Sequence, residues 1–194
     1  MTATDDDCTK QIKELRHAIL RNALYHIARR SWHERVNRFL NLGVIIGGTV
    51  YVAKIWPGSP GWDLALGLAT STIGAMQLVF DFGGKARDHQ MLQKRYYDIR
   101  AAIDGNTAPM TADCAKWRAE LTRIYADEPP TFRALDAIAD NQATAALHDA
   151  VKPRLKVNLW QSLTRNIFVH NGGEFPIQPG WKAESLSADE NKAG

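Results

Sequence analysis

The sequence predicts an all-α fold, in which a two-helix transmembrane hairpin extends into a cytosolic helical stalk and is followed by a small cytosolic helical lobe. Two apolar runs, Phe39–Trp56 and Leu64–Phe80, flank the short turn Pro57–Gly61. The first run holds one charge, Lys54, and the second holds none. At about 1.5 Å per residue, a helix of either length nearly covers the apolar core of a bilayer. Elsewhere apolar residues recur at helical spacing, and no strand pattern is present.

The ends of the two runs have the composition of membrane borders. Trp56 and Trp62 lie beside the turn, and indole rings favour the headgroup layer. Lys and Arg gather at the opposite ends of the runs and are missing from the turn. The positive-inside rule then places both termini in the cytoplasm, with transmembrane helices over about 39–56 and 62–82. The alternative is that both are core helices of a soluble bundle, since five glycines lower their mean hydropathy.

The overall charge does not indicate a nucleic-acid-binding protein. The 194 residues carry a net charge of +3, but the basic residues lie beside the apolar runs and form no separate stripe. Cys8 and Cys114 match no metal-binding or redox spacing, so we expect reduced thiols. The N-terminus carries Asp5, Asp6 and Asp7 where a signal peptide would be basic. Insertion is therefore expected to use the first membrane helix itself.

The helices next to the membrane are predicted to form the stalk. Residues 1–9 are predicted to be disordered, and residues 10–105 to form one long helical hairpin that ends at the turn signal Asp104–Asn106. Antiparallel helices joined by a short turn stay neighbours, so the apolar stripes on either side of the membrane runs should pack together. The stripes are Ile12, Leu15, Ile19, Ala23 and His26, and Leu92, Tyr96, Ile99 and Ile103.

Residues 106–170 are predicted to form the cytosolic lobe from three short helices, over about 112–127, 131–150 and 153–169. Pro129 and Pro130 end the first helix, and Pro153 begins the last. Asp113 and Thr131 are candidate N-caps. Residues 171–194 are predicted to be a disordered tail. The predicted inward faces are Trp117, Leu121 and Ile124, then Leu135, Ile138, Gln142 and Ala146, then Leu155, Leu159, Leu163 and Ile167.

The second membrane run carries one polar and small-residue stripe. Two interpretations of it remain open: a packing seam in which Thr70 and Gln77 hydrogen-bond to the first helix, or the lining of a pore built from several copies. On the first run, Gly43 and Gly47 form a second small-residue face that permits close helix packing. The stripe consists of Asp63, Gly67, Thr70, Gly74, Gln77 and Asp81.

A polar cluster is predicted in the stalk just below the membrane. Symmetry about the turn places Arg38 near Asp81, and places Arg29 and Arg30 near Asp88 and His89, so ion pairs are expected there. The arginines also serve as topology determinants. The histidines, His26, His33 and His89, are either ordinary polar residues of the stalk or parts of a pH- or ligand-sensitive gate. The predicted cluster consists of His26, Arg29, Arg30, Arg38, Asp88 and His89.

The sequence indicates no enzyme, cofactor or metal site. The six histidines include no i, i+4 pair beside a glutamate, so no zinc-protease motif is present. Gly83-Gly84-Lys85 lacks the spacing of a phosphate-binding loop.

The chain resembles the SLATT families, the SMODS- and SLOG-associating two-transmembrane effector domains of bacteria. The resemblance covers roughly residues 10 to 170. It implies an effector of the bacterial inner membrane in nucleotide-signalled anti-phage defence, one that oligomerises and permeabilises the membrane. The implied partners are a nucleotide second messenger or a nucleotidyltransferase-linked system. The residues that carry the resemblance are Tyr25-His26 and Arg29-Arg30, then Ala86, His89 and Tyr96, then Asp127–Thr131, Leu135-Asp136 and Asn141.

Two functions are therefore weighed. The first is an oligomeric pore whose path is lined by the polar stripe of the second run. The second is a membrane-anchored scaffold in which the helices at 111–168 dock a partner protein and the hairpin acts only as a tether.

Overall fold

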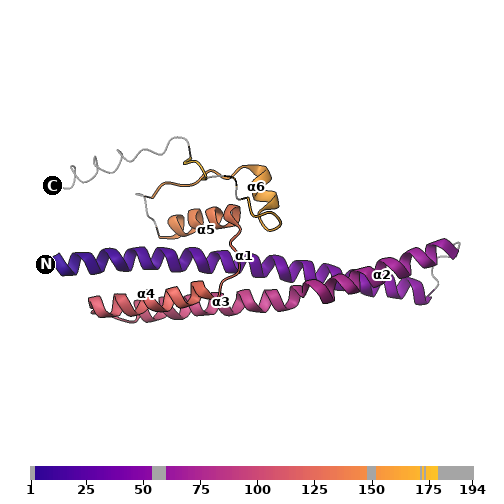
Figure 1. Ribbon diagram of the computed structural model, residues 1–194, viewed down its shortest axis with the longest axis horizontal. Helices are drawn as coiled ribbons and strands as arrows, with labels where there is room; N and C mark the ends of the chain where they lie inside the picture. The colour runs from indigo at the N-terminus through magenta and orange to yellow at the C-terminus, as the bar shows by residue number, and fades with distance from the viewer. Residues whose placement is uncertain (1–2, 54–59, 148–151, 171, 173, 179–194) are drawn as a thin grey trace. The chain divides into compact units, whose positions relative to one another are not determined.

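The structure is a computed structural model that describes residues 3–53, 60–147, 152–170, 172 and 174–178. The elements described there are α-helices, together with one isolated β-bridge, so the predicted all-α fold is confirmed. Two compact units are described separately below: the core unit, residues 1–27 and 91–194, and the hairpin unit, residues 28–90. The helices are α1 (Ala3–Ala53), α2 (Pro60–Phe80), α3 (Phe82–Asp104), α4 (Thr111–Ala126), α5 (Arg133–Ala146) and α6 (Leu159–Thr164) (Figure 1).

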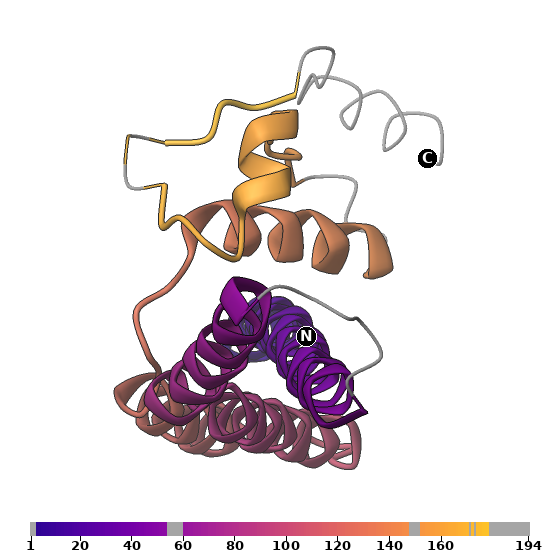
Figure 2. The same cartoon turned by 90° about the vertical axis from the view of Figure 1, so that its right-hand side faces the viewer.

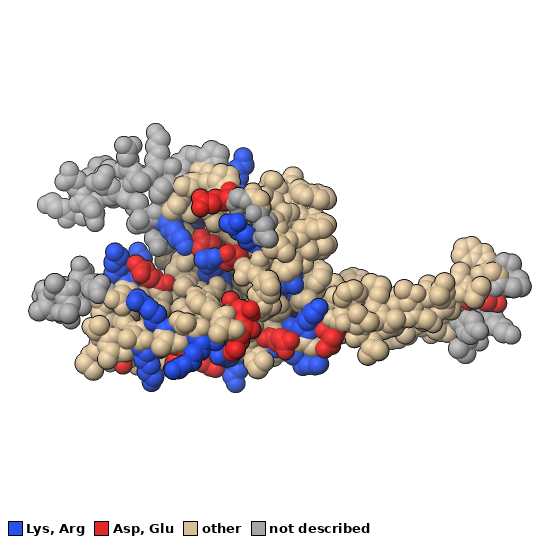
Figure 3. All heavy atoms as spheres, in the orientation of Figure 1, with Lys and Arg blue, Asp and Glu red and all other residues tan. Residues whose placement is uncertain are grey.

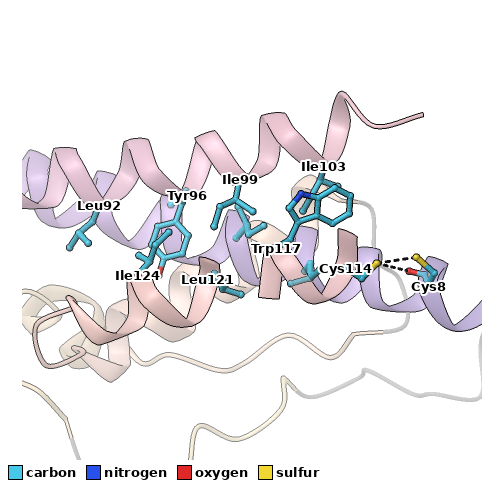
Figure 4. Close-up of a cluster of buried hydrophobic side chains, with 12 residues drawn as sticks. Cys8, Leu92, Tyr96, Ile99, Ile103, Cys114, Trp117, Leu121 and Ile124 are labelled. Carbon is cyan, nitrogen blue, oxygen red and sulfur yellow. Dashed lines mark hydrogen bonds between the residues drawn. The ribbon is translucent and has the colours of Figure 1, made fainter. Parts of the chain in front are cut away.

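The core unit is built on one hydrophobic cluster from three helices (Figure 4). The stripes of α1 and α3 pack together as predicted, with Ile19 and Tyr96 fully buried. The third face comes from α4, where Trp117 lies against the same cluster. The helix assigned to a separate lobe therefore completes the core of the stalk helices. The cluster consists of Cys8, Leu15, Ile19, Ala23, Leu92, Tyr96, Ile99, Ile103, Cys114, Trp117, Leu121 and Ile124.

Helix α5 lies on the side of α1 opposite α3 and α4 (Figures 1 and 2). Polar contacts hold it there: Arg21 Nε donates to Asp136 Oδ1 at 2.7 Å, and the Phe132 amide donates to the Tyr25 hydroxyl at 3.1 Å. Phe132 is the N-cap residue, where Thr131 was predicted. In α4 the N-cap residue is Met110, where Asp113 was predicted. Asp113 instead lies in the first turn and accepts from the Met110 amide at 3.0 Å.

The last predicted helix, 153–169, is much shorter in the structure. Helix α6 covers only Leu159–Thr164, because Asn158 caps it: the Asn158 side chain accepts from the Gln161 amide at 2.8 Å. The predicted inward face was wrong, since Leu159, Leu163 and Ile167 are exposed. The residues before Asn158 are extended instead of helical.

Part of the predicted tail is ordered against that extended segment. Leu155 and Ile177 form an antiparallel bridge. The Lys156 amide donates to the Pro176 carbonyl at 2.7 Å, and the Gln178 amide donates to the Arg154 carbonyl at 2.8 Å. Residues 174–178 are therefore held in place, and residues 179–194 lie outside the described residues.

Helix α1 begins at Ala3, inside the segment predicted to be disordered. Cys8 is buried there, with its Sγ 2.9 Å from Cys114 Sγ on α4. Both cysteines are free thiols. The two sulfurs, which the sequence placed in unrelated contexts, are therefore neighbours in the core.

Slow alkylation is expected at Cys114. Burial, and then its contact with Cys8, raise the pKa of this thiol from 9.0 to about 11. Below pH 9 that shift lowers the thiolate fraction about 100-fold. Mass spectrometry of iodoacetamide-treated protein at pH 8 should show Cys114 unmodified in the folded chain and modified after unfolding. Rapid modification of the folded protein would contradict this buried pair.

Candidate functional site

The hairpin unit exposes a continuous apolar surface. Large apolar side chains of α1 from Phe39 onward and of α2 have exposed fractions from 41 to 84%. On the face seen in Figure 3, these helices show neutral atoms, with acidic atoms near the turn. A core helix of a soluble bundle would bury these side chains, so the exposure argues against that alternative. The side chains concerned are Phe39, Leu42, Ile45, Ile46, Trp62, Leu64, Leu68, Met76, Leu78, Val79 and Phe80.

One stretch, Gly61–Asp104, is long and apolar enough to cross a membrane, and none of its most apolar window is buried. It includes the second predicted span, 62–82. The first predicted span, 39–56, falls on α1 as far as Ala53, and its last three residues lie outside the described residues. No second crossing stretch is identified in the part of the chain that the structure describes.

Within the hairpin unit, α1 and α2 meet along a polar and small-residue seam. Gln77 Nε2 donates to Asn41 Oδ1 at 2.8 Å. A methyl group added at Gly43 would lie 3.4 Å from Ile73, and one added at Gly47 would collide with the Thr70 hydroxyl. The structure therefore places Gly43 and Gly47 against α2, and places Thr70 and Gln77 against α1. These are the contacts of a packing seam.

The other members of the predicted stripe do not take part in this seam. A methyl group added at Gly67 or Gly74 meets nothing within 4 Å, and Asp63 is exposed. Asp81 lies between α2 and α3 with φ of 38°, a left-handed conformation that aspartate tolerates better than most residues. Its Oδ1 accepts from the Gly84 amide at 2.8 Å and so caps α3. The predicted stripe therefore divides into a seam, an open glycine face and a helix cap.

The predicted stalk cluster also divides. In the hairpin unit, Arg30 Nε lies 2.8 Å from Glu34, and Arg38 Nη2 lies 3.7 Å from the same carboxylate. Both arginines thus pair along α1 instead of with Asp81 or Asp88. The geometry favours this choice because i, i+4 neighbours on a helix lie side by side.

A histidine and aromatic cluster lies at the base of the hairpin unit. The rings of His33 and His89 stack at 5.5 Å between centroids, and Trp32 and Phe82 pack around His33. Arg29 lies over the Trp32 ring, and its Nη2 is 3.2 Å from His33 Nε2. Burial first, and then the charges of Arg29 and Lys85, lower the pKa of His33 to about 4. His33 is therefore neutral at physiological pH.

Acidification should weaken this cluster. Because the folded state lowers the pKa of His33 from 6.5 to about 4, the unfolded chain takes up a proton first as the pH falls. The stabilisation is complete above pH 6.5, falls by about 2 kcal/mol by pH 5 and is lost near pH 4. Thermal unfolding in detergent should show this loss in the native chain, and a smaller loss in His33→Phe. Equal pH slopes for the two proteins would contradict the assignment.

His26, by contrast, belongs to the core unit. Its Nε2 donates to Glu128 Oε1 at 2.8 Å, and the Tyr96 hydroxyl donates to the same oxygen. The rings of His26 and Tyr96 stack at 5.6 Å, and both side chains are almost fully buried. Burial and the hydrogen bond to Glu128 raise the pKa of Tyr96, so the hydroxyl stays protonated. Glu128, in the turn after α4, thus ties α1 to α3.

The core unit also contains a cavity of about 650 Å³ beside the N-terminal part of α1. Lys10, Lys13, Arg21 and Lys152 line it. Arg21 pairs with Asp136, and Lys152 Nζ lies 2.7 Å from Asp140. These carboxylates offset the cationic lining, so the cavity does not by itself indicate an anionic ligand.

Sequence reasoning missed Trp32, Phe82 and Glu128 as parts of these clusters. Two positions in the sequence could have pointed to the aromatic residues. Trp32 is next to the stalk histidine His33, and Phe82 is the last residue of the second predicted span. Glu128 lies within Asp127–Thr131, one of the segments that carry the family resemblance, and no contact was predicted for it. Comparison of the chain with protein-family models, with curated proteins and with solved structures finds no match.

Proposed function

We propose that this chain is a bacterial membrane effector that inserts its hairpin, residues 39–82, into the inner membrane and assembles there into a pore. The observation that carries insertion is the apolar surface of α1 and α2, which is exposed while Asn41, Thr70 and Gln77 turn toward the facing helix. Lipid is the solvent that suits this distribution. The resemblance to the SLATT families supports the effector role and its link to nucleotide-signalled anti-phage defence.

Assembly is assigned to the open glycine face of α2. Gly67 and Gly74 lie two turns apart on that face, with nothing within 4 Å of an added methyl group. Small residues allow another membrane helix to approach closely. Copies joined there would bring their Asp63 carboxylates together at the turn end of the assembly.

Ion flux through vesicles tests the proposal. Full-length protein is reconstituted in vesicles that contain a potassium-sensitive dye. These vesicles should release potassium, and the release is measured with and without added candidate cyclic nucleotides. Gly74→Leu should abolish the flux and the cross-linked oligomers, because it blocks the open face. Ala69→Leu, about 200° around the helix from Gly67, is the matched control and should leave flux unchanged. Undiminished flux from Gly74→Leu would refute assembly through the open glycine face, and no flux from the native protein would refute the pore.

The second candidate, a membrane-anchored scaffold for a protein partner, is favoured by one observation. Thr70 and Gln77 contact α1, so these two polar groups have a structural role without a pore. Replacing residues 39–82 by an unrelated hairpin separates the two functions. A scaffold would keep its protection of cells against phage, whereas a pore former would lose it.

A further inference from the structure

Helix α6 and the turn after it present a row of large apolar side chains to solvent. Leu159, Leu163 and Ile167 follow one another at intervals of one helical turn, and Trp160 and Phe168 lie beside them. Their exposed fractions range from 52 to 84%. These five side chains are called the α6 patch.

Ordered local structure holds the α6 patch outward. Asn158 and Gln161 cap each other, at 2.8 and 3.0 Å, at the start of α6. Beyond its end, the amides of Ile167 and Phe168 both donate to the Thr164 carbonyl, at 2.9 and 3.0 Å, and so continue the turn. The Thr164 side chain is buried and donates to the Trp160 carbonyl at 2.7 Å. The exposure of the patch is therefore a property of a folded segment.

The stretch of sequence that contains the α6 patch carries only positive charge, and the next acidic residue is the exposed Glu174. Between residues 152 and 173 the sequence contains Lys152, Arg154, Lys156 and Arg165, and no Asp or Glu. Arg154 and Lys156 are exposed, while Lys152 is paired with Asp140. An occupant that covers the patch must suit apolar contacts and a cationic border together.

We propose that the α6 patch binds the surface of an anionic phospholipid bilayer. Trp, Phe and Leu side chains on one face with basic residues beside them are the composition of interfacial membrane segments. The apolar row would enter the border of the acyl chains, and Arg154, Lys156 and Arg165 would lie near lipid phosphates. A partner protein could also bury this row. Binding to a protein, however, gives no reason for residues 152–173 to lack an acidic side chain, whereas binding to anionic lipid does. The binding does not depend on whether the hairpin forms a pore.

A fluorescent label at Leu163 tests this surface. The full-length Leu163→Cys variant is labelled with the dye NBD and reconstituted in vesicles of phosphatidylcholine and phosphatidylglycerol. Brominated lipids, which quench the dye, are placed in these vesicles in one experiment and in added protein-free vesicles in another. Quenching should be at least about threefold stronger than for the same label at Ala119→Cys, an exposed site on α4. Cys8 and Cys114 are buried, so the unmutated protein serves as the labelling blank.

Charge reversal separates lipid from protein as the occupant. Arg154→Glu with Lys156→Glu should weaken partitioning of the patch about tenfold, as should omission of phosphatidylglycerol. Equal quenching at positions 163 and 119, or equal quenching with and without phosphatidylglycerol, would overturn the proposal. A label at 163 that is shielded from aqueous iodide yet unaffected by bromine would also overturn it, because a protein or a second copy would then cover the patch.

Discussion

Leucine at Gly47 is expected to separate α1 from α2, whereas leucine at the neighbouring Gly48 is expected to leave the hairpin unit intact. A side chain at Gly47 collides with the Thr70 hydroxyl, while one at Gly48 meets nothing within 4 Å. Overpacking of this kind costs about 3 kcal/mol, which is roughly a 100-fold shift toward the separated helices. Asn41→Cys with Gln77→Cys provides the readout, since these side chains touch in the native hairpin. Oxidation should cross-link them in the Gly48→Leu background and fail to do so in Gly47→Leu.

A second substitution makes the steric cause specific. The collision at Gly47 is with the Thr70 hydroxyl, whereas Thr70 Cβ lies 3.5 Å from an added methyl group, an ordinary contact. Gly47→Ala should therefore weaken cross-linking as well, and adding Thr70→Ala should restore it. If Gly47→Leu and Gly48→Leu cross-link equally, the seam is not formed by these residues, and the stripe is available to line a pore.

Much of the fold could be predicted from periodicity. The stripes of α1 and α3 recur every three or four residues, so a helical hairpin was the simplest way to bury them, and the structure packs Leu15, Ile19, Tyr96 and Ile99 together. Periodicity wrongly predicted that Leu159, Leu163 and Ile167 are buried. A row of apolar residues shows which face of a helix is apolar, but it does not show whether another element covers that face. The burial of Cys8 was also missed, since the acidic start of the chain concealed the contact with α4.

The sequence predicted which residues of the candidate site lie near one another, but it did not predict which of them form ion pairs. Symmetry about the turn correctly suggested that residues near 38 face residues near 81, and Asn37 indeed lies 3.8 Å from a methyl group added at Gly83. The partner of Arg38 was nevertheless Glu34, one turn away on the same helix. Sequence spacing alone does not rank a local ion pair against one across the hairpin.

Alanine at Glu128 is expected to destabilise the core unit by about 2–4 kcal/mol. Glu128 accepts from two buried donors on different helices, His26 Nε2 and the Tyr96 hydroxyl. Removing the carboxylate takes away this acceptor from two donors whose side chains are almost fully buried. Differential scanning calorimetry should show a fall in Tm of roughly 10 °C.

The adjacent Asp127 supplies the matched control for this prediction. It pairs with Arg95, but the side chains are 59 and 37% exposed, so the pair contributes at most about 1 kcal/mol. Asp127→Ala should therefore lower Tm by only a few degrees, and Glu128→Gln, which keeps a carbonyl acceptor, should lie between the two alanine variants. Equal losses at 127 and 128 would mean that the turn after α4 acts through its backbone, with no special role for the carboxylate that joins α1 and α3. The ordering of the three variants thus measures how far one partly buried acceptor, rather than apolar packing alone, holds the helices of the core unit together.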